Sequence, residues 1–517
     1  MNGDLSGGMN GTIYERLNAA KPAPMSFSTA DIVFAYSMLV CGFLYWNFID
    51  VGSLGLGVTL FTAVLCTSAI FYFRAAGIRQ SKTSLLFLGI VILSAANFAL
   101  FDGGPVKAFN FIFLSLGFVY WVCLTTGTRL ENKISIYILS DMLRQLLVIP
   151  FGNFAGCFKG IGQVFLKNKK GKGVLGGIVG FLIFLPVLIL VITLLTSADA
   201  AFESLVDRVR FIFSANLLEY ILDFILGLPV ACYLYGLIYG SRYKRNIGNV
   251  TTETVDEYVT VLRFAPGATV YSALTALNLI YLVFFLAQTS YLFSAFNDSL
   301  PQTLTYAEYA RRGFFELCAV SGINFAVIAA AHLITKRDNI KILRGETAAL
   351  CIFTVALIVT AMSKMGMYIG YYGLTRLRVY TSWFMIVLLF LFIIILFRQF
   401  KGFNGTRIAA AGCICLFMAL CYGNVDGVIA KYNIDRYQAG TLESLDLDAL
   451  TALSDAAVPY LYELYQETDD SEIKNDLRVA IKEGVFQRED MFGDVYKDDF
   501  RDINLQSYRA NLIRETI

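Results

Sequence analysis

Long apolar runs, separated by short polar connections, dominate the hydropathy pattern of this chain. Eleven runs come close to or exceed the roughly 20 residues that a helix needs to cross a bilayer. A transmembrane β-barrel would instead show short segments of alternating apolar and polar residues, which are absent from this sequence. The pattern predicts an all-α fold, a polytopic transmembrane helical bundle. The expected spans are 31–49, 55–73, 84–101, 108–126, 174–196, 216–239, 269–293, 313–335, 347–367, 379–397 and 408–422.

The connection after the fourth span has a helical pattern of its own. Aromatic residues recur there every three or four positions, so a helix would present one apolar face, and the basic run LKNKKGK follows it. This pattern predicts an amphipathic helix in the headgroup plane, with anionic lipids of the bilayer as its partner. A re-entrant segment is the competing interpretation. The predicted membrane-surface anchor is Phe151, Phe154, Phe158, Phe165, Lys167, Lys169 and Lys170.

After residue 422 the long apolar runs end. The remaining segment holds 20 acidic and 10 basic residues, and leucines at helical spacing indicate short amphipathic helices. Because so small a domain is of marginal stability alone, we expect it to dock on the bundle. The predicted organisation is a polar N-terminus (1–29), four spans (30–126), a basic loop (127–172), seven spans (173–422) and an acidic helical domain (423–517).

Composition agrees with a membrane protein, and charge predicts its orientation. Hydrophobic residues make up 57% of the 517 residues, charged residues 16%, and the mean hydropathy is +0.61. Connections on one side of the predicted spans hold 24 Lys and Arg, and those on the other side hold seven. Since cytoplasmic loops are enriched in Lys and Arg, the N-terminus is expected in the cytoplasm and the acidic domain outside the cell membrane.

Residues typical of catalytic or metal sites are scarce. Nine of the ten cysteines fall in predicted spans, where they suit helix packing, and the one histidine is His332. The sequence contains no phosphate-binding glycine loop, no paired-histidine zinc motif and no CxxC pair. We therefore expect that the protein binds no cofactor, no metal and no nucleic acid, and we assign no catalytic residue. An enzyme built on this chain would have to use carboxylates, tyrosine or lysine.

Charged and polar residues gather at the predicted outer ends of the later spans. Two interpretations stay open: an aromatic belt with charges that fix the outer loops, or a polar cavity that binds an anionic headgroup, an envelope precursor or a coupling ion. On the span that holds Asn278 and Tyr281, these residues share a helix face with Gln288. The candidate ligand-binding residues are Glu219, Asp223, Gln288, Tyr291, Arg311, Arg312, Glu316, Lys364, Arg376 and Arg378.

Four sequence motifs carry a resemblance to a known family. They are QTSYLF (288–293), TYAEYARRGFFEL (305–317), YGLTRLRVYTSWF (372–384) and NVDGVIAKYNIDRY (424–437). In these motifs the chain resembles the bacterial polytopic membrane family catalogued as domain of unknown function 4173, and is similar to its sibling family 4153. The resemblance covers roughly residues 269–464. It implies a bacterial plasma-membrane protein and brings no established activity.

Three functions are compatible with the sequence. The first is a non-enzymatic envelope protein that binds or moves an anionic or amphiphilic molecule at an outward-facing polar site. The second is a membrane-embedded enzyme acting on a lipid-linked substrate. The third is a sensor or scaffold whose outer domain recruits an envelope ligand or protein partner.

Overall fold

The structure is a computed structural model that describes most of the chain. The described residues are 24–50, 52, 54–166, 215–247, 251–287, 314–336, 339–442, 445–483 and 500–517, with isolated positions between 184 and 202. Among them, the only β-type pairing is an isolated bridge between Ala265 and Thr335. In the described part of the chain, ten helices are long and apolar enough to cross a membrane. The predicted all-α polytopic bundle is confirmed, and the expected span 174–196 lies mostly outside the described residues.

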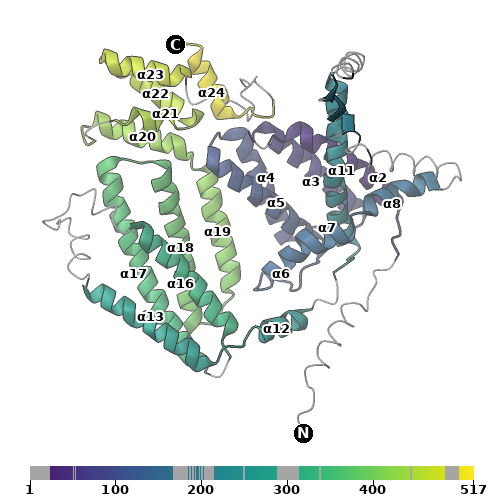
Figure 1. Ribbon diagram of the computed structural model, residues 1–517, viewed down its shortest axis with the longest axis horizontal. Helices are drawn as coiled ribbons and strands as arrows, with labels where there is room; N and C mark the ends of the chain where they lie inside the picture. Colours follow the sequence, from purple (N-terminus) through teal and green to yellow (C-terminus); the bar gives the residue numbers. More distant parts are fainter. Residues whose placement is uncertain are drawn as a thin grey trace, which may run out of the picture.

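The long helices of the N-terminal half form a first group around one apolar core (Figure 1). Short helices between α5 and α11 fold back against α2 and α11. The group consists of α2 (Thr29–Phe48), α3 (Leu56–Ala75), α4 (Lys82–Leu100), α5 (Gly104–Thr126) and α11 (Ala215–Arg242), with the short α6 (Ile138–Leu143), η1 (Arg144–Val148), α7 (Ile149–Gly152) and α8 (Gly156–Leu166).

Helices α2 and α11 pack closely because glycines meet at their crossing. A Cβ atom on Gly42 would overlap the carbonyl oxygen of Gly227, and one on Gly227 would overlap the carbonyl oxygen of Gly42. Small residues at a helix crossing let backbones approach, which increases van der Waals contact where the hydrophobic effect contributes little. This crossing sets the spacing of the first group.

A buried carboxylate joins three helices of the first group. Asp31 at the start of α2 is fully buried and accepts hydrogen bonds from the Tyr72 hydroxyl (2.6 Å) and the Tyr243 hydroxyl (2.8 Å). Arg242 at the end of α11 donates from Nη1 to Asp31 Oδ1 at 2.7 Å. Because Asp31 is paired and fully hydrogen-bonded, its charge is accommodated at the end of the bundle. Its role is to hold α2, α3 and α11 together.

The later spans form a second group with its own apolar core (Figure 1). Its last helix, α19, also contacts α4 and α5, so it connects the two groups. The helices are α13 (Gly267–Ala287), α16 (Phe314–Ile334), α17 (Ile340–Tyr372), α18 (Arg376–Phe400) and α19 (Gly405–Tyr422). Helix α17 has 33 residues and is longer at both ends than the predicted span 347–367.

Buried polar side chains cross-link the second group. The Tyr281 hydroxyl of α13 donates to Asn324 of α16 at 2.7 Å, and Asn324 donates to Thr354 of α17 at 2.9 Å. Asn278 of α13 donates to Glu346 of α17 at 2.8 Å. The polar face expected from Asn278 and Tyr281 therefore makes helix-to-helix hydrogen bonds, which are a common means of association between membrane helices.

The predicted amphipathic helix of the basic loop is broken in the structure. A turn at residues 153–155 separates α7 from α8, so the aromatic residues do not share one continuous helical face. The glycines permit burial against α11: a Cβ atom on Gly156 would lie 3.1 Å from the ring of Tyr235. The spacing of the aromatic residues favoured a single helix because a sequence pattern carries no information about this packing.

The acidic C-terminal segment forms a helical domain that covers one end of both groups (Figure 1). Leu374, in the connection between α17 and α18, and Val379 of α18 pack against its core, so the domain is docked on the bundle. The domain contains α20 (Val425–Gln438), α21 (Leu447–Thr451), η2 (Asp455–Ala457), α22 (Val458–Glu467), α23 (Ser471–Glu483) and α24 (Leu505–Arg514).

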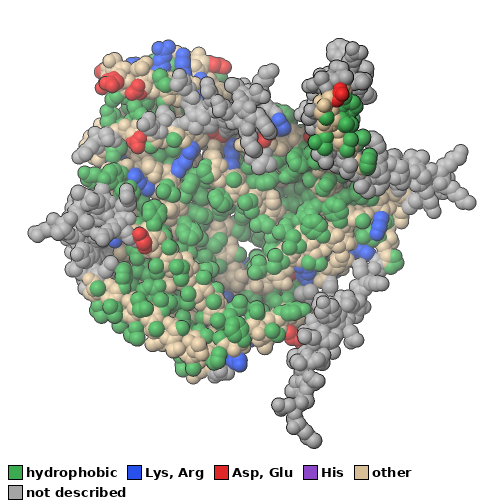
Figure 2. Space-filling view, in the orientation of Figure 1, with side chains coloured by type: hydrophobic (Ala, Val, Ile, Leu, Met, Phe, Trp, Pro, Cys, Tyr) green, Lys and Arg blue, Asp and Glu red, His purple; other side chains and the backbone are tan. Residues whose placement is uncertain are grey.

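The two ends of the bundle differ in what covers them. We call the end under the C-terminal domain the domain end, and the other the α12 end, after the short helix α12 (Thr252–Val261) there. Figure 2 shows hydrophobic side chains over the spans of both groups, and this face is hollowed near its centre. The apolar belt between the two ends is the surface expected of a bilayer-spanning protein.

Candidate functional site

The structure describes only part of the predicted ligand-binding set. Gln288, Tyr291, Arg311 and Arg312 lie outside the described residues, and for Glu219 only the backbone, in α11, is described. The remaining candidates are Asp223, Glu316, Lys364, Arg376 and Arg378, which occupy three different places.

Asp223 is separated from the other carboxylate of the set. It lies on α11 in the first group, whereas Glu316 and Lys364 lie on α16 and α17 in the second group. Glu316 is exposed and interacts electrostatically with the half-buried Lys364. Glu316 and Lys364 therefore form a pair in the second group, and Asp223 lies on a helix of the first group.

Arg376, the first residue of α18, makes a two-point contact with the C-terminal domain. Its Nε donates to Asp426 Oδ1 at 2.8 Å, and its Nη2 donates to Asp426 Oδ2 at 2.6 Å. The backbone N–H of Ser454 donates to the same carboxylate at 3.0 Å. Burial acts to raise the pKa of Asp426, but the hydrogen bonds and charge of Arg376, with the hydrogen bond from the Ser454 backbone, hold the pKa below its usual value.

Arg378 caps the C-terminal end of α17. Its Nη1 donates to the carbonyl oxygens of Tyr372 (3.0 Å) and Gly373 (2.6 Å), and its guanidinium lies 4.2 Å from the ring centroid of Tyr368. A cation near a helix C-terminus satisfies carbonyl groups that lack helical partners. The described contacts thus give Arg378 a structural role.

The third and fourth sequence motifs meet at this place. Asn433 of α20 accepts from the Leu374 N–H at 2.7 Å and donates to the Leu374 carbonyl at 2.9 Å. Arg436 donates to the Gly370 carbonyl at 2.8 Å. The third and fourth motifs therefore contribute residues that join α17 and α18 to the C-terminal domain.

Two further ion pairs lie where the C-terminal domain meets the bundle, a region that we call the docking junction. Lys107 of α5 lies 3.2 Å from Asp102, and Asn504 of the C-terminal domain also donates to Asp102 at 3.3 Å. Arg514 of α24 donates to Asp455 at 2.6 Å. Each of the three buried aspartates forms an ion pair with a cation, which reduces the cost of burying its charge. Asp102, Asp426 and Asp455 were not among the residues predicted from the sequence, although Asp426 lies in the fourth motif.

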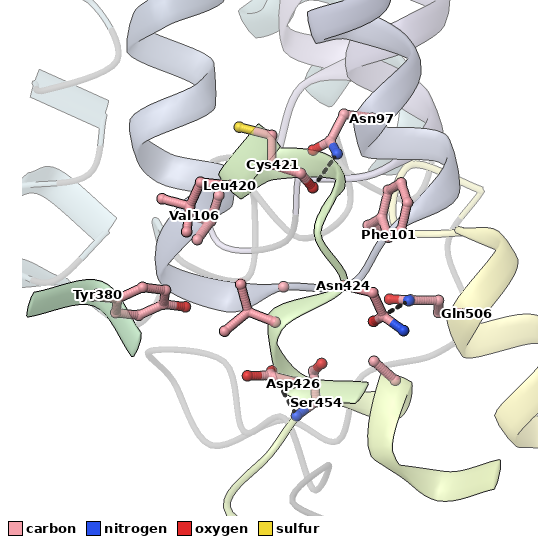
Figure 3. Close-up of a pocket in the computed structure, with 13 residues that line it drawn as sticks. Asn97, Phe101, Val106, Tyr380, Leu420, Cys421, Asn424, Asp426, Ser454 and Gln506 are labelled. Atoms are coloured by element: carbon pink, nitrogen blue, oxygen red, sulfur yellow. Dashed lines mark hydrogen bonds between the residues drawn. The ribbon is translucent and has the colours of Figure 1, made fainter. Parts of the chain in front are cut away.

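A small cavity lies beside Asp426, shown in Figure 3 with Asn97, Tyr380, Ser454 and Gln506 around it. Its volume is about 20 Å³, which is room for about one water. Ser454 Oγ is buried there with no hydrogen-bond partner. A cavity of this size suits a bridging water and excludes an organic ligand.

A much larger pocket, partly open to the surface, lies between helices of the first group. It has a volume of about 490 Å³ and is lined by α2, α3, α5, η1, α7 and α11. We call it the chamber. It runs from Ile49 and Val58, near the domain end, to Phe151 and Phe154 of the folded-back segment. The volume falls within the roughly 300–1,000 Å³ of small-molecule sites.

The chamber offers an apolar lining. Among the described residues that line it, Thr62 and Ser115 are the two that are neither aliphatic nor aromatic, and each hydroxyl donates to a carbonyl of its own helix at 2.8 Å. The hydroxyl of Tyr233 donates to the Leu146 carbonyl at 2.9 Å. With these polar groups satisfied inside the protein, the lining matches a hydrocarbon ligand.

The backbone is irregular at two places on the chamber wall. Leu146 belongs to the π-helix η1, in which the Ile149 N–H donates to the Arg144 carbonyl five residues earlier. Pro229 stands inside α11, where it removes a backbone donor. π-Helical turns inside helices are frequent at functional sites. Both irregularities fall where the chamber is formed.

The predicted membrane-surface anchor contributes to the chamber. Phe151 and Phe154 line it, and Phe158 packs on the first core. For Phe165 only the backbone is described, and Lys167, Lys169 and Lys170 lie outside the described residues. Binding of anionic lipids by this segment stays a prediction.

Within the described part of the chain, no group of three or more His, Cys, Asp or Glu could hold a metal ion. The family described as Domain of unknown function (DUF4153) matches residues 60–464, more than half of the 517 residues. The chain therefore belongs to this family, the sibling named above; the resemblance to family 4173 is not confirmed. No curated protein and no solved structure matches the chain. It is an integral membrane protein of a family without an assigned function.

Proposed function

We propose that this protein binds an amphiphilic molecule of the membrane and holds its hydrocarbon chain in the chamber. The observation that carries the proposal is an apolar cavity of about 490 Å³ between spans α2, α3, α5 and α11. The ligand class is a bilayer lipid or lipid-linked molecule, because a chain in the chamber leaves its polar head free to reach a membrane surface.

Selectivity in such a site comes from shape. Lipid tails are as apolar as the chamber wall, so a chain that moves from the bilayer into the chamber gains little from the hydrophobic effect. It gains van der Waals contacts with closely spaced side chains. Aromatic rings from α3, α5 and the folded-back segment, such as Phe61, Phe118 and Phe151, supply much of that surface.

The outward polar site predicted from the sequence is a weaker candidate. Arg376 is bound to Asp426, and Arg378 is bound to backbone carbonyls. To bind an anionic headgroup, Arg376 would have to leave its contact with the C-terminal domain, and Arg378 would have to leave the carbonyls at the end of α17. The chamber is therefore the favoured site for an amphiphilic ligand.

We place the protein in a bacterial plasma membrane, in a role connected with the cell envelope and with the C-terminal domain outside. The support is the unequal distribution of Lys and Arg, 24 on one side against seven on the other. A non-enzymatic role is favoured over an enzyme because Asp102, Asp426 and Asp455 are each paired with a cation at the junction.

Lipid retention tests this proposal. Ser115 of α5 is exposed and lines the chamber, whereas Ile112, three residues earlier, is also exposed (56%) and does not line it. In native mass spectrometry of the full-length protein, a co-purified lipid should stay bound to wild type and to the Ile112→Phe control. Ser115→Phe should weaken retention about tenfold, which corresponds to about 1.4 kcal/mol of lost binding. The mass identifies the lipid, and equal retention by all three proteins would overturn the proposal.

A further inference from the structure

Helix α12 (Thr252–Val261) is well formed but has no buried residue. A capping box at Thr251 and Thr254 fixes its start. Its apolar side chains and those just after it are open: Tyr258 is 51% exposed, Val261 77%, Leu262 46% and Phe264 68%. A capped helix that leaves its large apolar residues uncovered needs a partner for that face.

The two faces of α12 differ sharply. Val255, Tyr258, Val259 and Leu262 follow the spacing of one apolar helix face. The acidic residues Glu253, Asp256 and Glu257 occupy the opposite side. The helix is therefore amphipathic, and its polar face is acidic.

The position of α12 is fixed at the level where the spans end. The chain directly after it pairs with the end of α16, since the Ala265 N–H donates to the Ile334 carbonyl and the Lys336 N–H donates to the Ala265 carbonyl, both at 3.0 Å. On its acidic side, Asp256 accepts from the Tyr137 hydroxyl at 2.9 Å. Figure 1 shows α12 lying across the direction of the spans, between α11 and α13.

We propose that α12 is an interfacial helix whose apolar face is buried in the lipid leaflet at the α12 end. The partner is the boundary between headgroups and acyl chains, because the exposed face is apolar and lies beside the ends of spans that cross the same bilayer. Its acidic face points to water, since anionic headgroups would repel it. The binding is therefore driven by apolar contact and does not depend on anionic lipid.

Such a helix connects the two groups through the membrane surface. It stands in the link between α11 of the first group and α13 of the second. Movement of either group relative to the other would have to move α12 along the leaflet. This role is independent of the chamber and of what the chamber binds.

Depth-dependent quenching tests the inference on the full-length protein. Tyr258→Cys and Thr260→Cys, two exposed positions on opposite faces, each receive an environment-sensitive nitrobenzoxadiazole label in phosphatidylcholine vesicles. Labelled protein without an added cysteine gives the background. Phosphatidylcholine with a doxyl group on the upper acyl chain should quench the label at 258 several-fold more than the label at 260.

Three results would overturn the inference. One is equal quenching at both positions. Another is stronger quenching at 258 that appears only when phosphatidylserine is added, which would make the binding electrostatic. The last is protection of position 258 that rises with protein density in the vesicle and is unaffected by doxyl lipid, which would make a second copy of the chain the partner.

Discussion

Arg376 and Asp426 join the membrane bundle to the C-terminal domain through two hydrogen bonds, at 2.8 and 2.6 Å. The side chain of Asp426 is 2% exposed and that of Arg376 is 29% exposed. A planar guanidinium that contacts both carboxylate oxygens fixes orientation as well as distance. The pair therefore sets the position of α20 on α18.

Asp426→Asn should loosen the C-terminal domain. It leaves a partly buried guanidinium without its counter-charge, and breaking a buried pair costs about 3–5 kcal/mol. Because water screens the exposed part of Arg376, we expect the lower end of that range. The readouts are Tm and the rate at which a protease releases the domain. Asp435→Asn is the control, since its pair with Lys431 is more than half exposed, and it should change neither readout.

Acid should weaken the same docking. The pKa of Asp426 is held below its ordinary value of 3.8, so the unfolded chain takes up the proton first as the pH falls. The contribution to stability is complete above that ordinary value and is lost as the pH drops through the lower, folded pKa. Tm measured from about pH 6 to about pH 3 should fall less steeply in Asp426→Asn than in wild type. If Tm falls equally steeply toward acid pH in the two proteins, this account is contradicted.

An added methyl group should not fit at the crossing of α2 and α11, where Gly42 meets Gly227. A Cβ atom on Gly42 meets the backbone of Gly227, which cannot rotate away, and overpacking typically costs about 1–3 kcal/mol. Gly42→Ala should lower Tm in detergent by a corresponding amount. Gly89→Ala is the matched control, because a Cβ atom on Gly89 of α4 meets nothing within 4 Å; an unchanged Tm in Gly42→Ala would refute the close contact.

The orientation predicted from charge can be tested in intact cells. Cysteines introduced at the exposed Asp469 of the C-terminal domain and at the exposed Glu253 of α12 lie at opposite ends of the bundle. An impermeant thiol reagent should label position 469 in whole cells and position 253 only after lysis. The reverse pattern would place the domain in the cytoplasm.

Sequence patterns were sufficient for the fold and insufficient for the sites. The length of an apolar run follows from bilayer thickness, so the helices were predictable within a few residues. The partner of a charge depends on how distant segments pack, and Asp102 meets Asn504 across 402 positions of the chain. The sequence therefore predicted that Arg376 binds a ligand, and the structure shows it bound to Asp426.

The chamber had no sequence signature for a similar reason. Its wall combines residues such as Val58, Leu114 and Leu237, which read as ordinary span residues in the sequence. The empty space arises because η1 and α7 fold back between α5 and α11, and the aromatic pattern indicated a surface helix instead. Only the three-dimensional packing shows that these residues border one partly open pocket.

Photolabelling from inside the chamber tests the central claim most directly. Full-length protein is reconstituted with a trace of phosphatidylethanolamine that carries a diazirine near the end of one acyl chain, and the labelled residues are mapped by mass spectrometry. We predict labelling of buried chamber residues such as Leu65, Leu114 and Leu237, which are 5%, 5% and 0% exposed, and its loss in Ser115→Phe. Labelling confined to lipid-facing residues such as Phe109 and Ile112, unchanged in Ser115→Phe, would contradict the account.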